Sequence, residues 1–236
     1  MYKIFYNFIL SIIFTVIFIL TANANNTQDD GVKFILLDKS YGTKNKEAYK
    51  FYDKGNQALD KNNLKEAQSN FLKALEIDPS FVDALDHLGI TYRRANDYEK
   101  AENTYLKSIK INSENFIPYA NLALIYLFQE RFGESIKMYS KAIELDPQSP
   151  EAYYGIGLAY YTMEDYKTSV KYIDEAIEKY KIAKSQYIYD AYTVQGENYY
   201  MLKDKTKALE YYKKASELEA QNTYLQDMIK ELEGLD

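Results

Sequence analysis

The chain has 236 residues, of which 27% are charged, and its formal net charge is −6 at pH 7. Charges of both signs are mixed along its length without a basic stripe, which argues against nucleic-acid binding because a phosphate backbone needs a positive surface. The chain contains no cysteine and a single histidine, His87. This composition excludes disulfides, thiol nucleophiles and zinc sites built from cysteines or several histidines.

The first 24 residues have the composition of a secretory signal. Lys3 supplies a positive start, residues 4–20 are mainly apolar, and residues 22–24 (Ala-Asn-Ala) match the small-x-small site of signal peptidase. We therefore predict a signal peptide that is cleaved after Ala24. The alternative is an uncleaved N-terminal anchor, because the apolar stretch lies at the lower limit of length for a membrane-spanning helix. The first case predicts a secreted or periplasmic protein, and the second one anchored to the inner membrane and facing outward.

Residues 25–47 form a polar leader that contains one apolar run, residues 32–37 (Val-Lys-Phe-Ile-Leu-Leu). Three interpretations of this run stay open. It could be an arm that packs on the open face of the first repeat, part of a disordered stretch, or a segment that meets a partner or occupies the protein's own groove.

The central part of the chain repeats itself with a period of 34 residues. Small residues mark this period at Gly55, Gly89, Ala123, Gly157 and Gly196, with intervals of 34, 34, 34 and 39. Large and small residues recur around each mark at helical spacing, which predicts two amphipathic helices per unit joined by a short polar turn. The second unit shows the framework well: Leu85, Leu88, Gly89, Tyr92, Ala101, Tyr105 and Ser108.

This framework resembles the tetratricopeptide repeat (TPR), whose pattern is an aromatic residue, Leu-Gly, Tyr, and then Ala, Phe, Ala and Pro. The resemblance implies an all-α fold, namely a right-handed α-solenoid of about five TPR helix pairs followed by a C-terminal capping helix. The predicted TPR domain covers residues 48–222, with units at 48–81, 82–115, 116–149, 150–188 and 189–222. Residues 223–236 form the predicted capping helix, whose apolar stripe consists of Tyr224, Leu225, Met228, Ile229 and Leu232.

Two details of the packing follow from the same register. Gly55 and Gly89 should let the two helices of a unit approach, with Phe71 and Tyr105 filling the space beside them. The long fourth interval should extend the second helix of the fourth unit, because its residues contain no helix breaker. Five extra residues correspond to about 1.4 helical turns, either as a tolerated length difference or as a ledge that changes the curvature of the groove.

The chain shows no catalytic constellation. A Ser-His-Asp triad would have to use His87, which no nucleophile motif supports. The Gly155-Ile156-Gly157 sequence lies in the middle of a predicted helix and follows no strand, so it is not a phosphate-binding loop. We therefore predict no enzymatic activity, no cofactor and no metal site.

The resemblance places the first helix of each unit along a concave groove that binds a protein segment. By register, the residues expected to bind the partner are Tyr52, Asn56, His87, Arg93, Arg94, Asn121, Leu124, Leu127, Phe128, Tyr154, Leu158, Tyr161 and Tyr200. The wider lining adds Tyr49, Asp53, Leu59, Asp83, Asp86, Ile90, Ile117, Glu151, Asp190, Thr193 and Glu197.

The middle of this groove is apolar and aromatic, which favours a docked helix or extended peptide. The docking residues expected there are Leu124, Leu127, Phe128, Leu158 and Tyr161. The carboxylate clamp of some TPR proteins, in which Lys, Asn, Asn, Lys and Arg hold a C-terminal carboxylate, does not fit this chain. Asn56 occupies one clamp position, but His87, Ile117 and Asn121 occupy later ones.

The predicted function is a protein–protein interaction scaffold or adaptor, exported to the periplasm or cell envelope, with no nucleic-acid ligand. Membrane contact is expected only through residues 1–24, if they are kept. One alternative is a membrane-anchored envelope assembly factor. Another is a small-molecule or glycan-binding TPR protein with a closed pocket between the fourth and fifth units.

Overall fold

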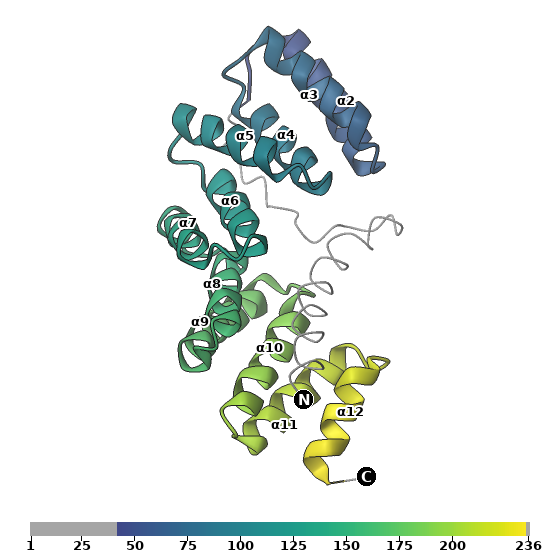
Figure 1. Ribbon diagram of the computed structural model, residues 1–236. Helices are drawn as coiled ribbons and strands as arrows, with labels where there is room; N and C mark the ends of the chain where they lie inside the picture. Colours follow the sequence, from purple (N-terminus) through teal and green to yellow (C-terminus); the bar gives the residue numbers. More distant parts are fainter. Residues whose placement is uncertain (1–41, 235–236) are drawn as a thin grey trace. The chain divides into compact units, whose positions relative to one another are not determined.

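A computed structural model describes residues 42–234, and all regular secondary structure in this part of the chain is helical (Figure 1). The described chain forms eleven helices and divides into two compact units, Met1–Gln129 and Glu130–Asp236. The predicted signal peptide and the apolar run at residues 32–37 lie outside the described residues.

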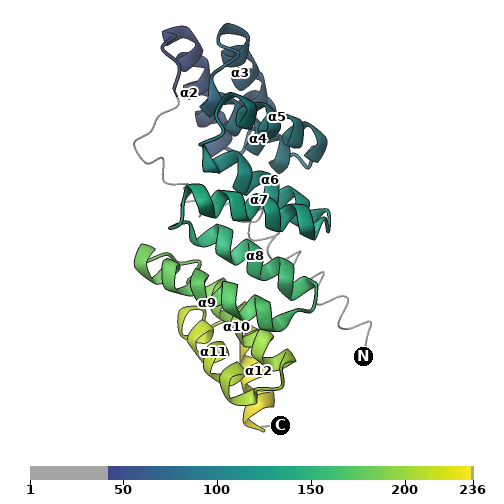
Figure 2. The ribbon, with the colours of Figure 1, turned by 90° about the vertical axis from the view of Figure 1, so that its left-hand side faces the viewer.

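The first unit contains five helices, each of which contacts the next along the chain (Figure 2). Their bounds are α2 (Lys46–Asp60), α3 (Leu64–Ile77), α4 (Val82–Arg94), α5 (Tyr98–Ile111) and α6 (Phe116–Phe128). The first helices of successive pairs also meet, since α2 contacts α4 and α4 contacts α6. In this arrangement the first helices share one face of a TPR stack. Helix α2 begins two residues before the predicted start at residue 48.

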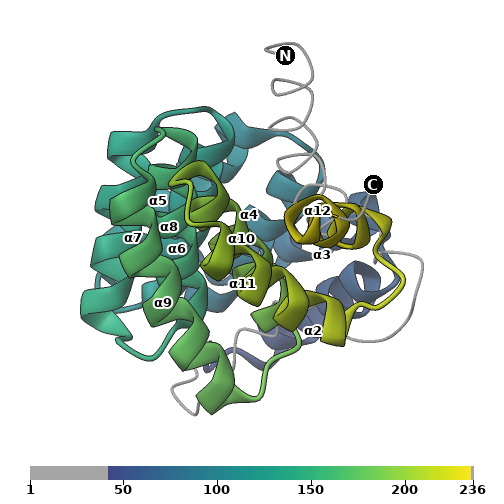
Figure 3. The ribbon, with the colours of Figure 1, turned by 90° about the horizontal axis from the view of Figure 1, so that it is seen from below.

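The second unit contains six helices, and again each contacts the next (Figures 1 and 3). They are α7 (Phe132–Leu145), α8 (Pro150–Thr162), α9 (Tyr166–Ala183), α10 (Ile188–Met201), α11 (Lys205–Leu218) and α12 (Thr223–Glu233). Helix α9 has 18 residues, whereas α11 has 14. The extra residues of the long interval therefore extend α9, as predicted, and α10 begins at Ile188, one residue before the expected boundary.

Glycines allow the two helices of a pair to approach closely. A Cβ atom built on Gly55 would lie 2.5 Å from Cε1 of Phe71, and one built on Gly89 would lie 2.5 Å from Cε1 of Tyr105. Phe71 and Tyr105 are fully buried. The prediction that these rings fill the space opened by the glycines is therefore confirmed.

The turns inside the pairs share a backbone feature that the sequence does not reveal. One residue in each turn has a left-handed conformation, with φ between 54° and 65°, and these equivalent residues are Asn62, Asn96, Glu130, Glu164 and Lys203. In the first turn, the N–H of Asn63 donates to the carbonyl oxygen of Ala58 at 2.8 Å, which closes a Schellman motif. The side chain of Asn63 then caps α3 by accepting from the N–H of Glu66.

Helix α12 covers the apolar end of the last pair. Leu225 is fully buried against Ala208, Tyr212 and Ala215, and the remaining residues of the predicted stripe are partly buried around it. The polar side of the helix stays exposed, as expected of a capping element in a repeat protein.

Candidate functional site

The first helices of the first unit bring several predicted binding residues onto one face. Tyr52 of α2 lies edge-on to His87 of α4, with ring centroids 5.2 Å apart, and it also contacts Phe81 at 4.9 Å. Nδ1 of His87 lies 2.9 Å from the carbonyl oxygen of Asp83, a distance that fits a hydrogen bond donated by Nδ1–H. Burial lowers the pKa of His87, so this imidazole is neutral at pH 7.

Asp86 was expected in the groove, but it is buried and ties helices together. Its carboxylate accepts hydrogen bonds from Oγ of Ser108 and from Nδ2 of Asn115, each at 2.6 Å. These bonds join α4 to α5 and to the turn before α6. Burial raises the pKa of Asp86 to about 7, although the two hydrogen bonds favour the ionised form. Asp86 therefore stabilises the stack and is not part of an accessible binding surface.

Three buried polar atoms of the first unit make no hydrogen bond of good geometry to the described residues. They are Oδ1 of Asn56, Nε of Arg93 and the hydroxyl of Tyr105. Arg93 nevertheless lies close enough to Tyr105, and Asn56 to Tyr52, to lower the pKa of the tyrosine. These atoms are therefore part of the interior of the unit.

Helix α6 supplies the apolar part of the same unit. Leu124, Leu127 and Phe128 are partly exposed, and the ring of Phe128 lies 6.3 Å from that of Tyr98. The helix contains no charged residue over its 13 positions. A helix that is apolar on every side is normally buried all round, so its partly exposed residues mark a surface suited to a partner.

In the second unit, a buried carboxylate organises the tyrosines. Glu197 of α10 accepts a hydrogen bond from the Tyr212 hydroxyl at 2.6 Å and another from the Tyr224 hydroxyl of α12. Burial raises the pKa of Glu197, whereas the hydroxyls of Tyr212, Tyr224 and Tyr161 lower it. The hydroxyl of Tyr200 donates to Oε1 of Glu231 at 2.9 Å, which adds a second link to the capping helix.

Four of the thirteen predicted partner-binding residues need correction because their side chains are buried, as do Leu59, Asp86 and Glu197 of the wider lining. Tyr52, Asn121, Leu158 and Tyr161 have exposed fractions of 6%, 3%, 8% and 6%. Tyr52 packs on Phe71 and Phe81, Tyr161 lies against Tyr166, and Nδ2 of Asn121 donates to the carbonyl oxygen of Ile117 in its own helix. The nine others are partly exposed, and their role in binding stays a prediction: Asn56, His87, Arg93, Arg94, Leu124, Leu127, Phe128, Tyr154 and Tyr200.

The described residues show neither a metal centre nor a membrane span. No group of three or more histidine, cysteine, aspartate or glutamate side chains between residues 42 and 234 could hold a metal ion. Within the same range, no helix has both the length and the apolar composition that crossing a bilayer requires.

Comparison with known proteins identifies the repeats. Sequence models described as TPR or tetratricopeptide repeat match residues 51–81, 70–103, 125–164, 151–181 and 189–222. A comparison with curated protein sequences gives no match.

Several solved structures share the fold. The chain is 20% identical to Pseudomonas aeruginosa pilF, with a TM-score of 0.71 over 79% of this chain and 82% of that chain. It is 23% identical to a MamA protein, with a TM-score of 0.62 over 75% of this chain and 94% of that chain. YrrB, described as a TPR protein with an unusual peptide-binding site, is 21% identical, with a TM-score of 0.61 over 78% and 92% of the two chains. The chain therefore carries tetratricopeptide repeats and has the all-α fold of TPR helix pairs.

Proposed function

We propose that the protein is an exported interaction scaffold that binds a segment of a partner protein on the first-helix face of its first unit. The observation that carries this proposal is the apolar surface of α6, where Leu124, Leu127 and Phe128 stay partly exposed in a helix without charges. The partly exposed side chains of Asn56 on α2 and Arg93 on α4 add polar groups to the first helices of the same unit.

A polypeptide fits these features better than a small ligand does. Apolar anchors and separate backbone hydrogen-bonding groups are the elements of peptide recognition, in which side chains give affinity and the backbone sets the orientation. The TPR protein YrrB, which shares this fold, is described as having a peptide-binding site. That similarity supports the class of ligand but does not identify the partner.

Binding can be tested with a double substitution on α6, Leu124→Glu with Phe128→Glu. The control is Leu106→Glu on α5, which places one such charge at a leucine that is 45% exposed. Both proteins and the wild type are used to capture partners from the envelope fraction of the host, and captured proteins are quantified by mass spectrometry. Circular dichroism checks that each variant is folded.

We expect the wild type and the Leu106→Glu control to capture the same partner, and the α6 variant to capture at least tenfold less of it. Equal capture by a folded α6 variant would contradict the proposed surface. Tyr161, a predicted docking residue, is not used as a test position, because it is buried beside Glu197 and a second carboxylate there would disturb the fold.

We further propose that the repeats act outside the cytosol, on the strength of the signal-like residues 1–24. Sequencing the N-terminus of the protein purified from its host distinguishes the two forms. A chain that begins at Asn25 indicates a released scaffold, whereas a chain that keeps residues 1–24 indicates an anchored assembly factor. Recovery of the protein only from the cytosol would contradict both.

A further inference from the structure

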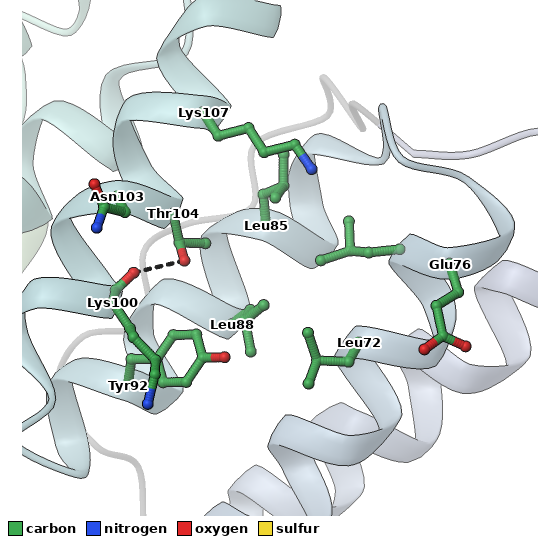
Figure 4. Close-up of a pocket in the computed structure, with 10 residues that line it drawn as sticks. Leu72, Glu76, Leu85, Leu88, Tyr92, Lys100, Asn103, Thr104 and Lys107 are labelled. Atoms are coloured by element: carbon green, nitrogen blue, oxygen red, sulfur yellow. Dashed lines mark hydrogen bonds between the residues drawn. The ribbon is translucent and has the colours of Figure 1, made fainter.

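The first unit has a shallow depression that is largely open to solvent, formed by α3, α4 and α5, which we call the α3–α5 groove (Figure 4). Its volume is about 460 Å³, enough to hold a few side chains. It is lined by Leu72, Leu75, Glu76, Leu85, Leu88, Tyr92, Lys100, Asn103, Thr104 and Lys107.

The α3–α5 groove has an apolar base and charged edges. Leu85 and Leu88 of α4 are buried beneath it, whereas Leu72 of α3 is 39% exposed at its side. Figure 4 shows Leu72 pointing toward Leu88, with Lys107 of α5 on one edge and Glu76 of α3 on the other. Lys100 is paired with Asp97 at 2.6 Å, so Lys107 is the cation of this lining that an acidic group of an occupant would meet.

The chain enters the first unit close to this groove. The Thr43 hydroxyl donates a hydrogen bond to Oδ2 of Asp78, the residue that follows α3. The side chain of Asn45 then caps α2 by accepting from the N–H groups of Glu47 and Ala48. These contacts fix residue 43 at the C-terminal end of α3, one of the two helices that form the walls of the groove.

The apolar run at residues 32–37 is near enough to reach the groove from this point. Only residues 38–42 separate the run from Thr43, and an extended chain covers about 3.3 Å per residue, or about 20 Å in all. Leu72 lies in α3, six residues before the C-cap residue Asp78. This separation corresponds to about 9 Å of helical rise. The run can therefore lie beside Leu72 without any rearrangement of the helices.

The composition of this segment matches the groove. The run provides valine, phenylalanine, isoleucine and two leucines besides Lys33, and it is flanked by Asp29 and Asp30 on one side and by Asp38 and Lys39 on the other. The apolar residues match the leucines of the groove, and Asp38 can meet the Lys107 amine.

We infer that residues 32–37 dock in the α3–α5 groove of their own chain, with Asp38 toward Lys107 of α5. The segment thereby covers Leu72 and is itself shielded from other proteins. This inference is independent of the partner-binding surface on α6, which lies on other residues of the unit.

Cysteine pairs test the inference cleanly because the chain contains no cysteine. Leu36→Cys is combined with Leu72→Cys in the full chain, and Ile35→Cys is used in a second pair because neighbouring residues of an extended segment point in opposite directions. One control pair joins Leu36→Cys to Leu106→Cys on α5. Another joins it to Leu124→Cys on α6. Disulfide formation under mild oxidation is followed on non-reducing gels and by intact mass.

We expect one of the Leu72→Cys pairs to form an intramolecular disulfide at least tenfold faster than either control pair. Adding Lys107→Glu should slow that reaction, because it removes the attraction for the acidic flank. Equal rates in all pairs, or a faster reaction with Leu124→Cys, would overturn the inference. A disulfide-linked dimer would also overturn it, since the occupant would then come from a second copy.

Discussion

Substitution of Gly89 by alanine tests how tightly the helix pairs are packed. A Cβ atom at residue 89 would lie 2.5 Å, 2.6 Å and 2.8 Å from three ring atoms of Tyr105. Contacts under 3.0 Å require something to move, and Tyr105 is fully buried, so its ring has no free space beside it. Such overpacking typically costs about 1–3 kcal/mol of the free energy of unfolding.

The higher helix propensity of alanine opposes the packing penalty of Gly89→Ala, so a control variant is necessary. Alanine favours a helix over glycine by about 1 kcal/mol, so Gly89→Ala should destabilise the protein by roughly 0–2 kcal/mol in total. Gly133→Ala near the start of α7 isolates the favourable term, because a Cβ atom there meets no other atom within 4 Å. The two variants should differ by about 1–3 kcal/mol in the free energy of unfolding.

Urea unfolding followed by far-ultraviolet circular dichroism measures this difference. A second comparison adds Tyr105→Leu, which removes the ring that the new methyl group would meet. In that background the penalty of Gly89→Ala should disappear. If Gly89→Ala proved at least as stable as Gly133→Ala in the wild-type background, the reasoning from close helix approach would be refuted.

Three further outcomes follow from single residues. Leu225→Ala should lower the free energy of unfolding by about 2–5 kcal/mol, because the capping leucine is fully buried; a loss below 1 kcal/mol would argue against capping. Glu164→Gly should raise the free energy of unfolding by about 1 kcal/mol, because residue 164 has φ of 63°, a conformation that glycine adopts without strain. A lower free energy of unfolding, measured with urea, would contradict this. Burial raises the pKa of Asp86 to about 7, so the folded state binds more protons than the unfolded state. The stability of the wild type relative to Asp86→Asn should therefore fall as pH rises from about 4 to 7, and a rise across that range would contradict the assignment.

Much of the fold could be predicted because residues that pack on each other recur at a constant separation in every repeat. The spacing that marks Gly55 also places Phe71 one helix later, and the same offset relates Gly89 to Tyr105. The left-handed residue in each turn could not be predicted in the same way. Asn62 is a residue that tolerates this conformation, but Glu164 and Lys203 adopt it at equivalent positions without any sign in their chemistry.

For the candidate site, the sequence predicted on which helix face a residue lies, but not how far its side chain is buried. Helical periodicity correctly places Leu124 and Phe128 where they stay partly exposed. It also assigned Tyr161 to the accessible surface, although this side chain is 94% removed from solvent, with an exposed fraction of 6%. Periodicity fixes the face on which a residue lies, whereas burial depends on what the neighbouring helix presents. The Tyr161 hydroxyl bonds the buried carboxylate of Glu197 on α10, and the sequence of α8 alone does not indicate that this acceptor is present.

The Glu197 cluster suggests how a repeat protein keeps each helix beside the correct neighbour. Repeated apolar faces resemble one another, so apolar contacts alone discriminate poorly between neighbours. The carboxylate of Glu197 on α10 is held by Tyr212 of α11, Tyr224 of α12 and Tyr161 of α8, a combination of contacts that is specific to these four helices. Removing one partner of such a group leaves other polar atoms unsatisfied, whereas replacing the whole group with apolar residues is often neutral in stability.

This reasoning predicts different results for two variants. Glu197→Ala leaves the buried Tyr212 hydroxyl without its acceptor and should lower the free energy of unfolding by about 1–3 kcal/mol. The quadruple variant Glu197→Leu with Tyr161→Phe, Tyr212→Phe and Tyr224→Phe replaces the whole group. It should recover most of that stability, yet show a broader urea transition and poorer dispersion in NMR spectra. A quadruple variant that unfolds as sharply as the wild type, with well-dispersed spectra, would show that the cluster contributes stability and not specificity. The distinction matters because α12 closes the stack only if it recognises α10 and α11 over the other helix pairs.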